Sequence, residues 1–159
     1  MYEPILEFNY NYDFDENGVL FYLATLGKTT PYRNPHLIQQ VKAFYSSLGK
    51  GNIYEFVGRE IVNLRTLNEP YSFFGVDLGE DRYFIPSAYT IRNRNSSSHV
   101  MLNWALEGTN DKINFEVLDS RCFKSNDLEI DGTLERDRVQ MKVFALNILK
   151  LFFNLDAWM

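Results

Sequence analysis

The feature that most constrains the fold of this chain is a series of short apolar runs separated by turn-forming residues. The runs recur roughly every ten residues between clusters of glycine, proline and asparagine, a spacing typical of a β-sandwich or barrel. In the clearest run, Leu102, Trp104 and Leu106 alternate with polar or small neighbours and so occupy one face of a strand. The pattern predicts an all-β chain in which Trp104 is a core residue.

The remaining apolar segments follow less regular patterns. Strands are expected at residues 19–24, 73–78, 88–92 and 113–118, and two further short apolar runs span residues 53–57 and 61–64. Residues 37–45 fit either a helix or an irregular strand. Residues 143–153 are almost continuously apolar and fit either a buried strand pair or an apolar helix, but they are too few to span a membrane. Because no repeat or linker interrupts the pattern, one domain is expected over residues 1–159.

Composition and charge narrow the classes of partner. Aromatic residues make up 16% of the chain, and flat rings pack well on pleated sheets. The net charge of -5 argues against capture by nucleic acid or an anionic membrane, although Arg92, Arg94, Arg121 and Lys124 form a possible small basic rim. A single cysteine excludes an intramolecular disulfide, and the first residues lack the features of a secretory signal. A cytoplasmic, intracellular location is therefore expected.

The sequence contains no motif typical of catalysis. It has no phosphate-cradling glycine loop followed by lysine and no nucleophile elbow. His36 and His99 stand in different loops, so a zinc site lacks ligands, and both are expected to be ordinary loop residues. Cys122 lies near Arg121 and Lys124, which favour a thiolate, but it is expected to pack as a small apolar residue. We expect no enzyme activity, no cofactor and no metal.

Two acidic pairs also have simpler explanations. Asp13 with Asp15, and Glu80 with Asp81, lie in turn segments where acidic residues commonly form turns. The alternation that starts at Asp13 resembles the beginning of a calcium-binding loop. However, the twelfth position, which requires an acidic ligand, is Ala24. The acidic pairs therefore do not predict a calcium site.

Six segments in chain order resemble the discoidin domain family, also called the coagulation factor V/VIII type C family. They are residues 14–23, 34–36 (Asn-Pro-His), 68–79, 85–92, 103–111 and 115–119. Residues 68–79 are similar to the family pattern N-x-P-x-S-W-x-x-V-D-L-G, with Phe73 in place of tryptophan. Residues 103–111 are similar to N-W-x-L-E-G-S-N-D. The resemblance covers residues 14–128 and implies a galactose-binding-like jelly-roll β-sandwich.

Two of these segments also indicate which members of the family the chain resembles. The Asn-Pro-His segment and the segment at 89–92 (Tyr-Thr-Ile-Arg) resemble intracellular discoidin-like domains, which occur in proteins with BTB or HECT ubiquitin-ligase regions. Residues 129–159 diverge from the family pattern, and its closing strand is not recognisable there. This atypical apolar C-terminal segment either replaces the closing strand or marks a truncation, which would leave an apolar edge unpaired.

The resemblance implies a non-catalytic module that binds a protein or a glycan through loops at one end of the sandwich. Polar and aromatic residues in the loops are the expected contacts. They are Lys28, Tyr32 and Arg33 in the first loop, Arg94 and Asn95 in the loop after Ile91, and Arg121 and Lys124 after Leu118. The alternative is an assembly domain of the kind linked to a ubiquitin ligase or BTB region. It would dock on a partner or a second copy through its apolar C-terminal segment.

Overall fold

The computed structural model describes residues 6–12, 14–79, 82–91, 103–122 and 148–153. Several residues that the sequence singled out lie outside this description: Asp13, Glu80, Asp81, Arg92, Arg94, Asn95, His99, Leu102 and Lys124. The predicted contacts at Arg94, Asn95 and Lys124 therefore stay predictions. In the described part of the chain, no helix has the length and apolar character needed to cross a membrane.

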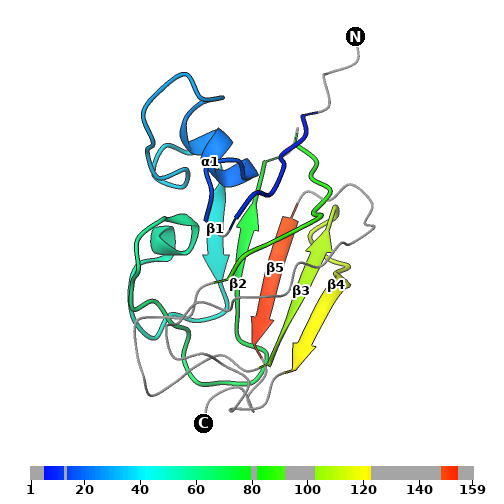
Figure 1. The fold of residues 1–159 in the computed structure, drawn as a ribbon. Helices are drawn as coiled ribbons and strands as arrows, with labels where there is room; N and C mark the ends of the chain where they lie inside the picture. The colour runs from blue at the N-terminus through cyan, green and yellow to red at the C-terminus, as the bar shows by residue number, and fades with distance from the viewer. Residues whose placement is uncertain (1–5, 13, 80–81, 92–102, 123–147, 154–159) are drawn as a thin grey trace.

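The described strands form one antiparallel sheet (Figure 1). The strands are β1 (Lys42–Tyr45), β2 (Phe73–Asp77), β3 (Asn103–Thr109), β4 (Glu116–Cys122) and β5 (Ile148–Phe153), in the order β1-β2-β5-β3-β4. The strands expected from the sequence at 73–78 and around Trp104 and Leu106 are confirmed, and β4 begins three residues later than predicted. The open choice for residues 37–45 resolves into a strand at their C-terminal end.

β5 lies inside the sheet, between β2 and β3. Val76 of β2 pairs with Leu149, and Leu106 of β3 pairs with Leu151, so this segment is hydrogen-bonded to a strand on each side. Residues 148–153 therefore do not form the unpaired edge on which the hypothesis of docking through this segment depended. The other residues of the apolar segment, 143–147, lie outside the described residues.

The strand predicted at residues 19–24 is wrong, because these residues form the short helix α1 (Val19–Ala24). In this helix the amide of Tyr22 donates to the carbonyl of Gly18 (3.0 Å), and Leu23 and Ala24 are buried. At the C-cap, the amide and the hydroxyl of Thr25 both donate to the carbonyl of Phe21 (3.0 and 2.9 Å). A continuous apolar run has no periodicity that distinguishes a strand from a buried helical turn. Here the burial of Leu23 and Ala24 favours the helical turn.

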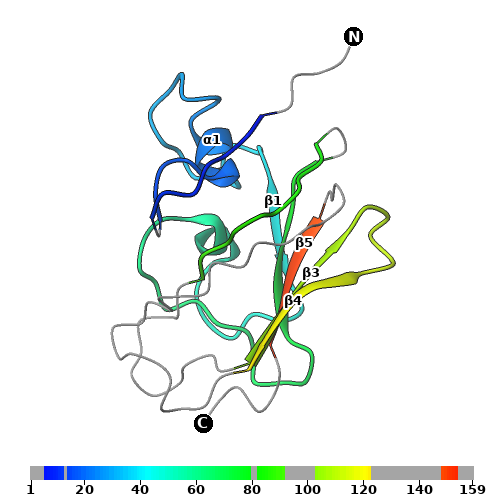
Figure 2. The same cartoon turned by 45° about the vertical axis from the view of Figure 1, so that its right-hand side comes forward.

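The layer that faces the sheet is also different from the expected second sheet. Residues 53–57 form the 3-10 helix η1 (Ile53–Val57), in which Glu55 accepts a hydrogen bond from the amide of Asn52 (3.0 Å). Residues 61–64 and 88–91 form no strand. Within the described residues, short helices and loops thus cover the sheet, as both views show (Figures 1 and 2). The chain is β-rich, but the described part is not all-β.

The core lies between the sheet and this covering layer. Phe74, Trp104 and Leu106 are buried, which confirms Trp104 as a core residue. Phe56 of η1 stacks on Phe74, with ring centroids 5.1 Å apart. A second buried cluster joins Leu23 of α1 to the apolar residues of β1 and β2. The sheet and α1 thus share one hydrophobic interior, which fixes the loop after α1 against the β1 side of the sheet.

The β3–β4 hairpin is closed by a carboxylate. Asp111 accepts hydrogen bonds from the amides of Ile113 (2.9 Å) and Asn114 (2.7 Å), and from the hydroxyl of Thr109 (2.8 Å). The hydrogen bonds from Asn114 and Ile113 hold the pKa of Asp111 well below its usual range. The last residue of the family-like segment at 103–111 therefore shapes a loop.

This hydrogen bonding predicts a pH-dependent contribution to stability. Because the pKa of Asp111 is lower in the folded chain, its contribution is complete above pH of about 4 and is lost as the pH falls through the folded-state pKa. Thermal unfolding of wild type and Asp111→Ala, followed by circular dichroism from pH 7 to pH 2, should show a lower Tm for the variant. The difference should shrink below pH of about 4. A difference independent of pH would contradict this role for the carboxylate.

Candidate functional site

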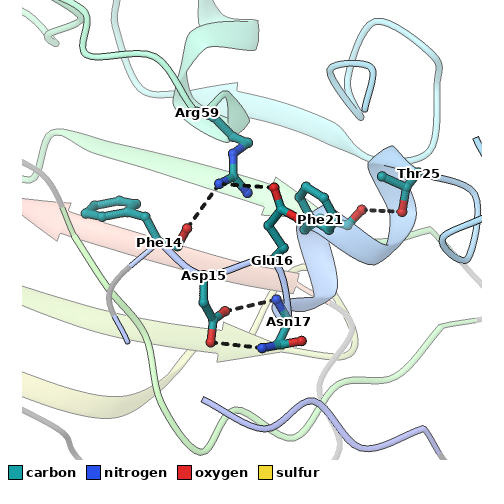
Figure 3. A network of polar contacts seen from close by, with 7 residues as sticks. All are labelled: Phe14, Asp15, Glu16, Asn17, Phe21, Thr25 and Arg59. Carbon is teal, nitrogen blue, oxygen red and sulfur yellow. Dashed lines mark hydrogen bonds and ion pairs between the residues drawn. The ribbon is translucent and has the colours of Figure 1, made fainter. Parts of the chain in front are cut away.

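A network of polar contacts is built around Arg59, two residues after the end of η1 (Figure 3). Its guanidinium lies over the ring of Phe21, 4.9 Å from the centroid, and 5.9 Å from the centroid of Tyr32. The two rings stack on each other with centroids 5.8 Å apart. Stacking on aromatic faces holds an arginine in one orientation without pairing its N–H donors. Arg59 is therefore presented in a fixed geometry.

Arg59 also anchors the segment that precedes α1. One guanidinium nitrogen donates to the carbonyl of Phe14 (3.1 Å) and lies 4.0 Å from the carboxylate of Glu16. Both side chains of this ion pair are exposed, so it contributes at most about 1 kcal/mol. Asp15 points away from Arg59 and accepts hydrogen bonds from the amide (2.9 Å) and side chain (3.3 Å) of Asn17 (Figure 3). The preceding segment is thus folded into a turn beside the guanidinium.

Two titratable groups reflect this packing. Burial raises the pKa of Tyr32, an effect that the charge of Arg59 opposes, and the net pKa is above its usual value. The Tyr32 hydroxyl is buried without a hydrogen-bond partner among the described residues. Burial also acts to raise the pKa of Asp15, but hydrogen bonds from Asn11 and Asn17 outweigh it, and the pKa is lowered. Tyr32 is therefore neutral at pH 7, and Asp15 is charged.

The structure brings two of the predicted contact residues to this cluster. Tyr32 is part of the ring stack, and the amine of Lys28 donates to the side chain of Asn17 (3.4 Å). Arg33 is exposed next to Tyr32, with its amide bound to the carbonyl of Ala24 (3.0 Å). Arg59 itself was missed. Its signal, a Gly-Arg-Glu segment after an apolar run, is the same as that of any solvated surface loop.

The predicted contact Arg121 lies elsewhere. It stands near the end of β4 and pairs in register with Trp104, at the end of the sheet away from α1 (Figures 1 and 2). Its guanidinium donates to Asp119 (2.8 Å), which also accepts the hydroxyl of Tyr89. Burial and the bond to Asp119 raise the pKa of Tyr89 to about 12. Arg121 is thus part of a network that packs against the core, separate from Lys28 and Tyr32.

The structure also shows the surroundings of His36 and Cys122. His36 has a structural role in its loop: Asn34 accepts its amide (3.0 Å), and its Nδ1 accepts the amide of Ala43 on the edge strand β1 (3.0 Å). The expectation that Cys122 packs as a small apolar residue is wrong, because it is exposed at the end of the edge strand β4. An edge strand has a neighbour on one side only, so its last residue is poorly covered.

The polar groups around Arg59 are suited to binding a partner. The cationic side chain of Lys28 donates to Asn17, and that of Arg59 lies against Glu16, while Arg33 is exposed. Over the described residues, no group of three or more His, Cys, Asp or Glu side chains is placed to hold a metal ion. A guanidinium held on aromatic rings is the kind of group that dominates binding energy in protein interfaces.

Sequence comparison relates the chain to parts of much larger proteins. It is 34% identical over 110 residues to E3 ubiquitin-protein ligase Ufd4 of Drosophila melanogaster, and 29% identical over 117 residues to E3 ubiquitin-protein ligase hecd-1 of Caenorhabditis elegans. These matches cover 65% and 70% of the chain, but only 4% of each relative. No protein-family model matches the chain.

Structural comparison identifies the fold. A Clostridium perfringens module named CpGH89CBM32-5, solved with GalNAc-β-1,3-galactose, superposes with a TM-score of 0.55 at 13% identity, over 76% of this chain and 89% of that one. The family 32 CBM of C. perfringens NanJ, solved with galactose, gives 0.52 at 12% identity, over 76% and 88%. The resemblance noted in the sequence is confirmed, and of the expected fold the galactose-binding-like, β-rich part is confirmed. The chain therefore has the galactose-binding-like fold of these family 32 modules and is homologous in sequence to a short part of two E3 ubiquitin-protein ligases.

Proposed function

We propose that this domain is a non-catalytic binding module of an intracellular E3 ubiquitin-protein ligase, and that it recognises a protein partner through the loop surface around Arg59. We define this Arg59 surface as residues 14–17, 28–33 and 59. The proposal is based on the position of the Arg59 guanidinium, which is held over the rings of Phe21 and Tyr32. Recognition groups that are ordered before binding lose little conformational entropy when a partner arrives.

The composition of the Arg59 surface suits a polar protein partner. Lys28 and Arg33 are exposed, and Glu16 and Asn17 supply acceptors of the opposite character. Mixed donors and acceptors beside an arginine are typical of interface rims and anchors. The homology to parts of two E3 ubiquitin-protein ligases, which are enzymes that act on proteins, supports a protein as the partner.

A glycan is the second candidate. The observation that favours it is the shared fold with modules solved in complex with galactose and GalNAc-β-1,3-galactose. Sugar rings commonly stack on an open aromatic face. Here Phe21 and Tyr32 stack on each other, and Arg59 covers the same rings. The protein partner is therefore the better fit to this geometry.

The test is a titration of the domain against a panel of peptides and glycans by fluorescence anisotropy. At least one binder from the panel should lose about tenfold or more in affinity in Arg59→Ala, because an arginine held in place on two aromatic rings is lost. Arg33→Ala and Lys28→Ala should have smaller effects, since rim charges contribute less. Lys50→Ala, which removes an exposed cation on a different loop, is the matched control and should leave affinity unchanged.

Arg59→Lys separates charge from geometry. Lysine keeps the positive charge but lacks the planar fork that lies over the two rings, so most of the loss should persist. Circular dichroism must show that each variant is folded. The Arg59 surface would be ruled out if every binder from the panel kept its affinity in a folded Arg59→Ala domain, or lost as much affinity in Lys50→Ala.

A further inference from the structure

A second surface lies at the end of the sheet away from α1, where β1 ends and β2 begins (Figure 1). Tyr71 is 77% exposed, and Tyr45 and Leu67 are also exposed. We call these three residues the Tyr71 surface. Tyr45 ends β1, and Leu67 and Tyr71 precede β2, so the two segments are far apart in sequence and are connected by hydrogen bonds.

Two serines join the loops. The amide of Ser46 donates to the carbonyl of Phe73 (3.1 Å), and the amide of Phe73 donates to the hydroxyl of Ser46 (3.0 Å). The hydroxyl of Ser47 accepts the amide of Leu67 (3.3 Å). Tyr45 is next to the first serine, Leu67 is bound to the second, and Tyr71 precedes Phe73 by two residues. The segments that carry the three exposed residues are therefore held together at this end of the sheet.

The loop that carries Tyr71 is held in an unfavourable state. Tyr71 has a φ of 58°, in the left-handed region that a bulky side chain rarely adopts. The two residues that flank the loop, Thr66 at 3% exposure and Ser72 at 1%, have buried hydroxyls without hydrogen-bond partners among the described residues. Strained backbone and unpartnered buried polar groups both destabilise a fold, and where they coincide they point to a functional site.

Charge is nearly absent from this surface. Across residues 45–48 and 66–73 the only charged residue is Glu69, although 23% of the chain is charged. Depletion of charge with enrichment of tyrosine is the composition of the central part of protein–protein interfaces. Nucleic acid and anionic membranes require basic groups, which these segments lack.

From the exposed tyrosines, the strained loop and the missing charge, we infer that the Tyr71 surface is a second docking site, for a protein segment that presents apolar side chains and uncharged hydrogen-bonding groups. It lies away from the Arg59 surface and does not depend on it. Binding at both ends of the sheet would let the domain bridge two proteins.

A random dodecapeptide phage library, panned on the 159-residue chain, provides the probe. Peptides selected in this way are expected to bind wild type in fluorescence anisotropy, and to lose about tenfold or more in affinity with Tyr71→Ser or Leu67→Ser. Tyr83→Ser, at a similarly exposed tyrosine outside the Tyr71 surface, and Arg59→Ala should leave the affinity unchanged. Unchanged affinity in Arg59→Ala separates this site from the proposed function.

Three outcomes would overturn the inference. One is that no peptide depends on Tyr71; another is that Tyr83→Ser weakens binding equally. The third is that sedimentation shows a wild-type dimer that Tyr71→Ser dissociates, which would assign the surface to a second copy of the chain. Thr66→Val provides a readout in the free domain, because removing an unpartnered hydroxyl should leave the Tm unchanged or raise it. A fall of several degrees would show that the hydroxyl has a partner.

Discussion

Trp104→Ala is expected to lower the free energy of unfolding by about 3–5 kcal/mol, the typical cost of removing a buried tryptophan. Trp104 is 6% exposed and packs with Phe74 and Leu106, and its indole N–H donates to the hydroxyl of Tyr89 (3.2 Å). Domains of this size are stable by about 5–15 kcal/mol, so the variant should lose much of its margin. Urea unfolding followed by circular dichroism measures the change as a lower midpoint.

Trp104→Phe is the matched control for ring volume. Phenylalanine keeps an aromatic ring in the core but cannot donate to Tyr89, so its loss should be clearly smaller than that of alanine. A Trp104→Ala midpoint equal to that of wild type would contradict the placement of Trp104 in the core. Equal losses in the two variants would show that the hydrogen bond, and not the ring volume, is the main contribution.

Gly49→Ala is the second substitution with a large expected effect. A Cβ atom at Gly49 would lie 2.6 Å from the carbonyl oxygen of Thr66, which is backbone and cannot rotate away. The amide of Gly49 donates to the carbonyl of Arg65 (2.9 Å), and Lys50 pairs with Arg65 as an isolated bridge. Relieving the clash therefore breaks these contacts. We expect a loss of about 1–3 kcal/mol, measured by the same urea titration.

Gly18→Ala serves as the control for adding a methyl group. Its Cβ would meet no atom within 4 Å, and its φ of -76° suits any residue. Its midpoint should stay close to that of wild type, since Ala and Gly differ little in an open position. A Gly49→Ala midpoint as high as that of Gly18→Ala would contradict the close approach of the two loop backbones.

The strands that alternate clearly were predictable from the sequence, and the continuous apolar runs were not. Leu106 and Trp104 repeat at a period of two, which only a strand presents to one face. Residues 19–24 and 53–57 have no such period, and their helical turns depend on packing against the sheet. The pairing of β5 with β2 joins residues more than 70 positions apart, which no local pattern specifies.

The candidate site was predictable only in part. Tyr32 and Lys28 were identified because polar and aromatic residues in a loop are often contacts, and the structure places Tyr32 beside Arg59 and Lys28 beside Asn17. Arg59 is 27 positions after Tyr32, and the sequence does not show that the two side chains meet. Arg121 was grouped with them by analogy to loops at one end, whereas the strand register places it at the other end.

The most direct test of the central claim is to map a bound partner onto the domain by the amide chemical shifts of ¹⁵N-labelled protein. With a binder from the peptide and glycan panel, we expect the largest chemical-shift changes on residues 14–17, 28–33 and 58–60. We also expect these changes to vanish in Arg59→Ala. Changes that leave these residues unaffected, and that persist in Arg59→Ala, would contradict recognition through the Arg59 surface.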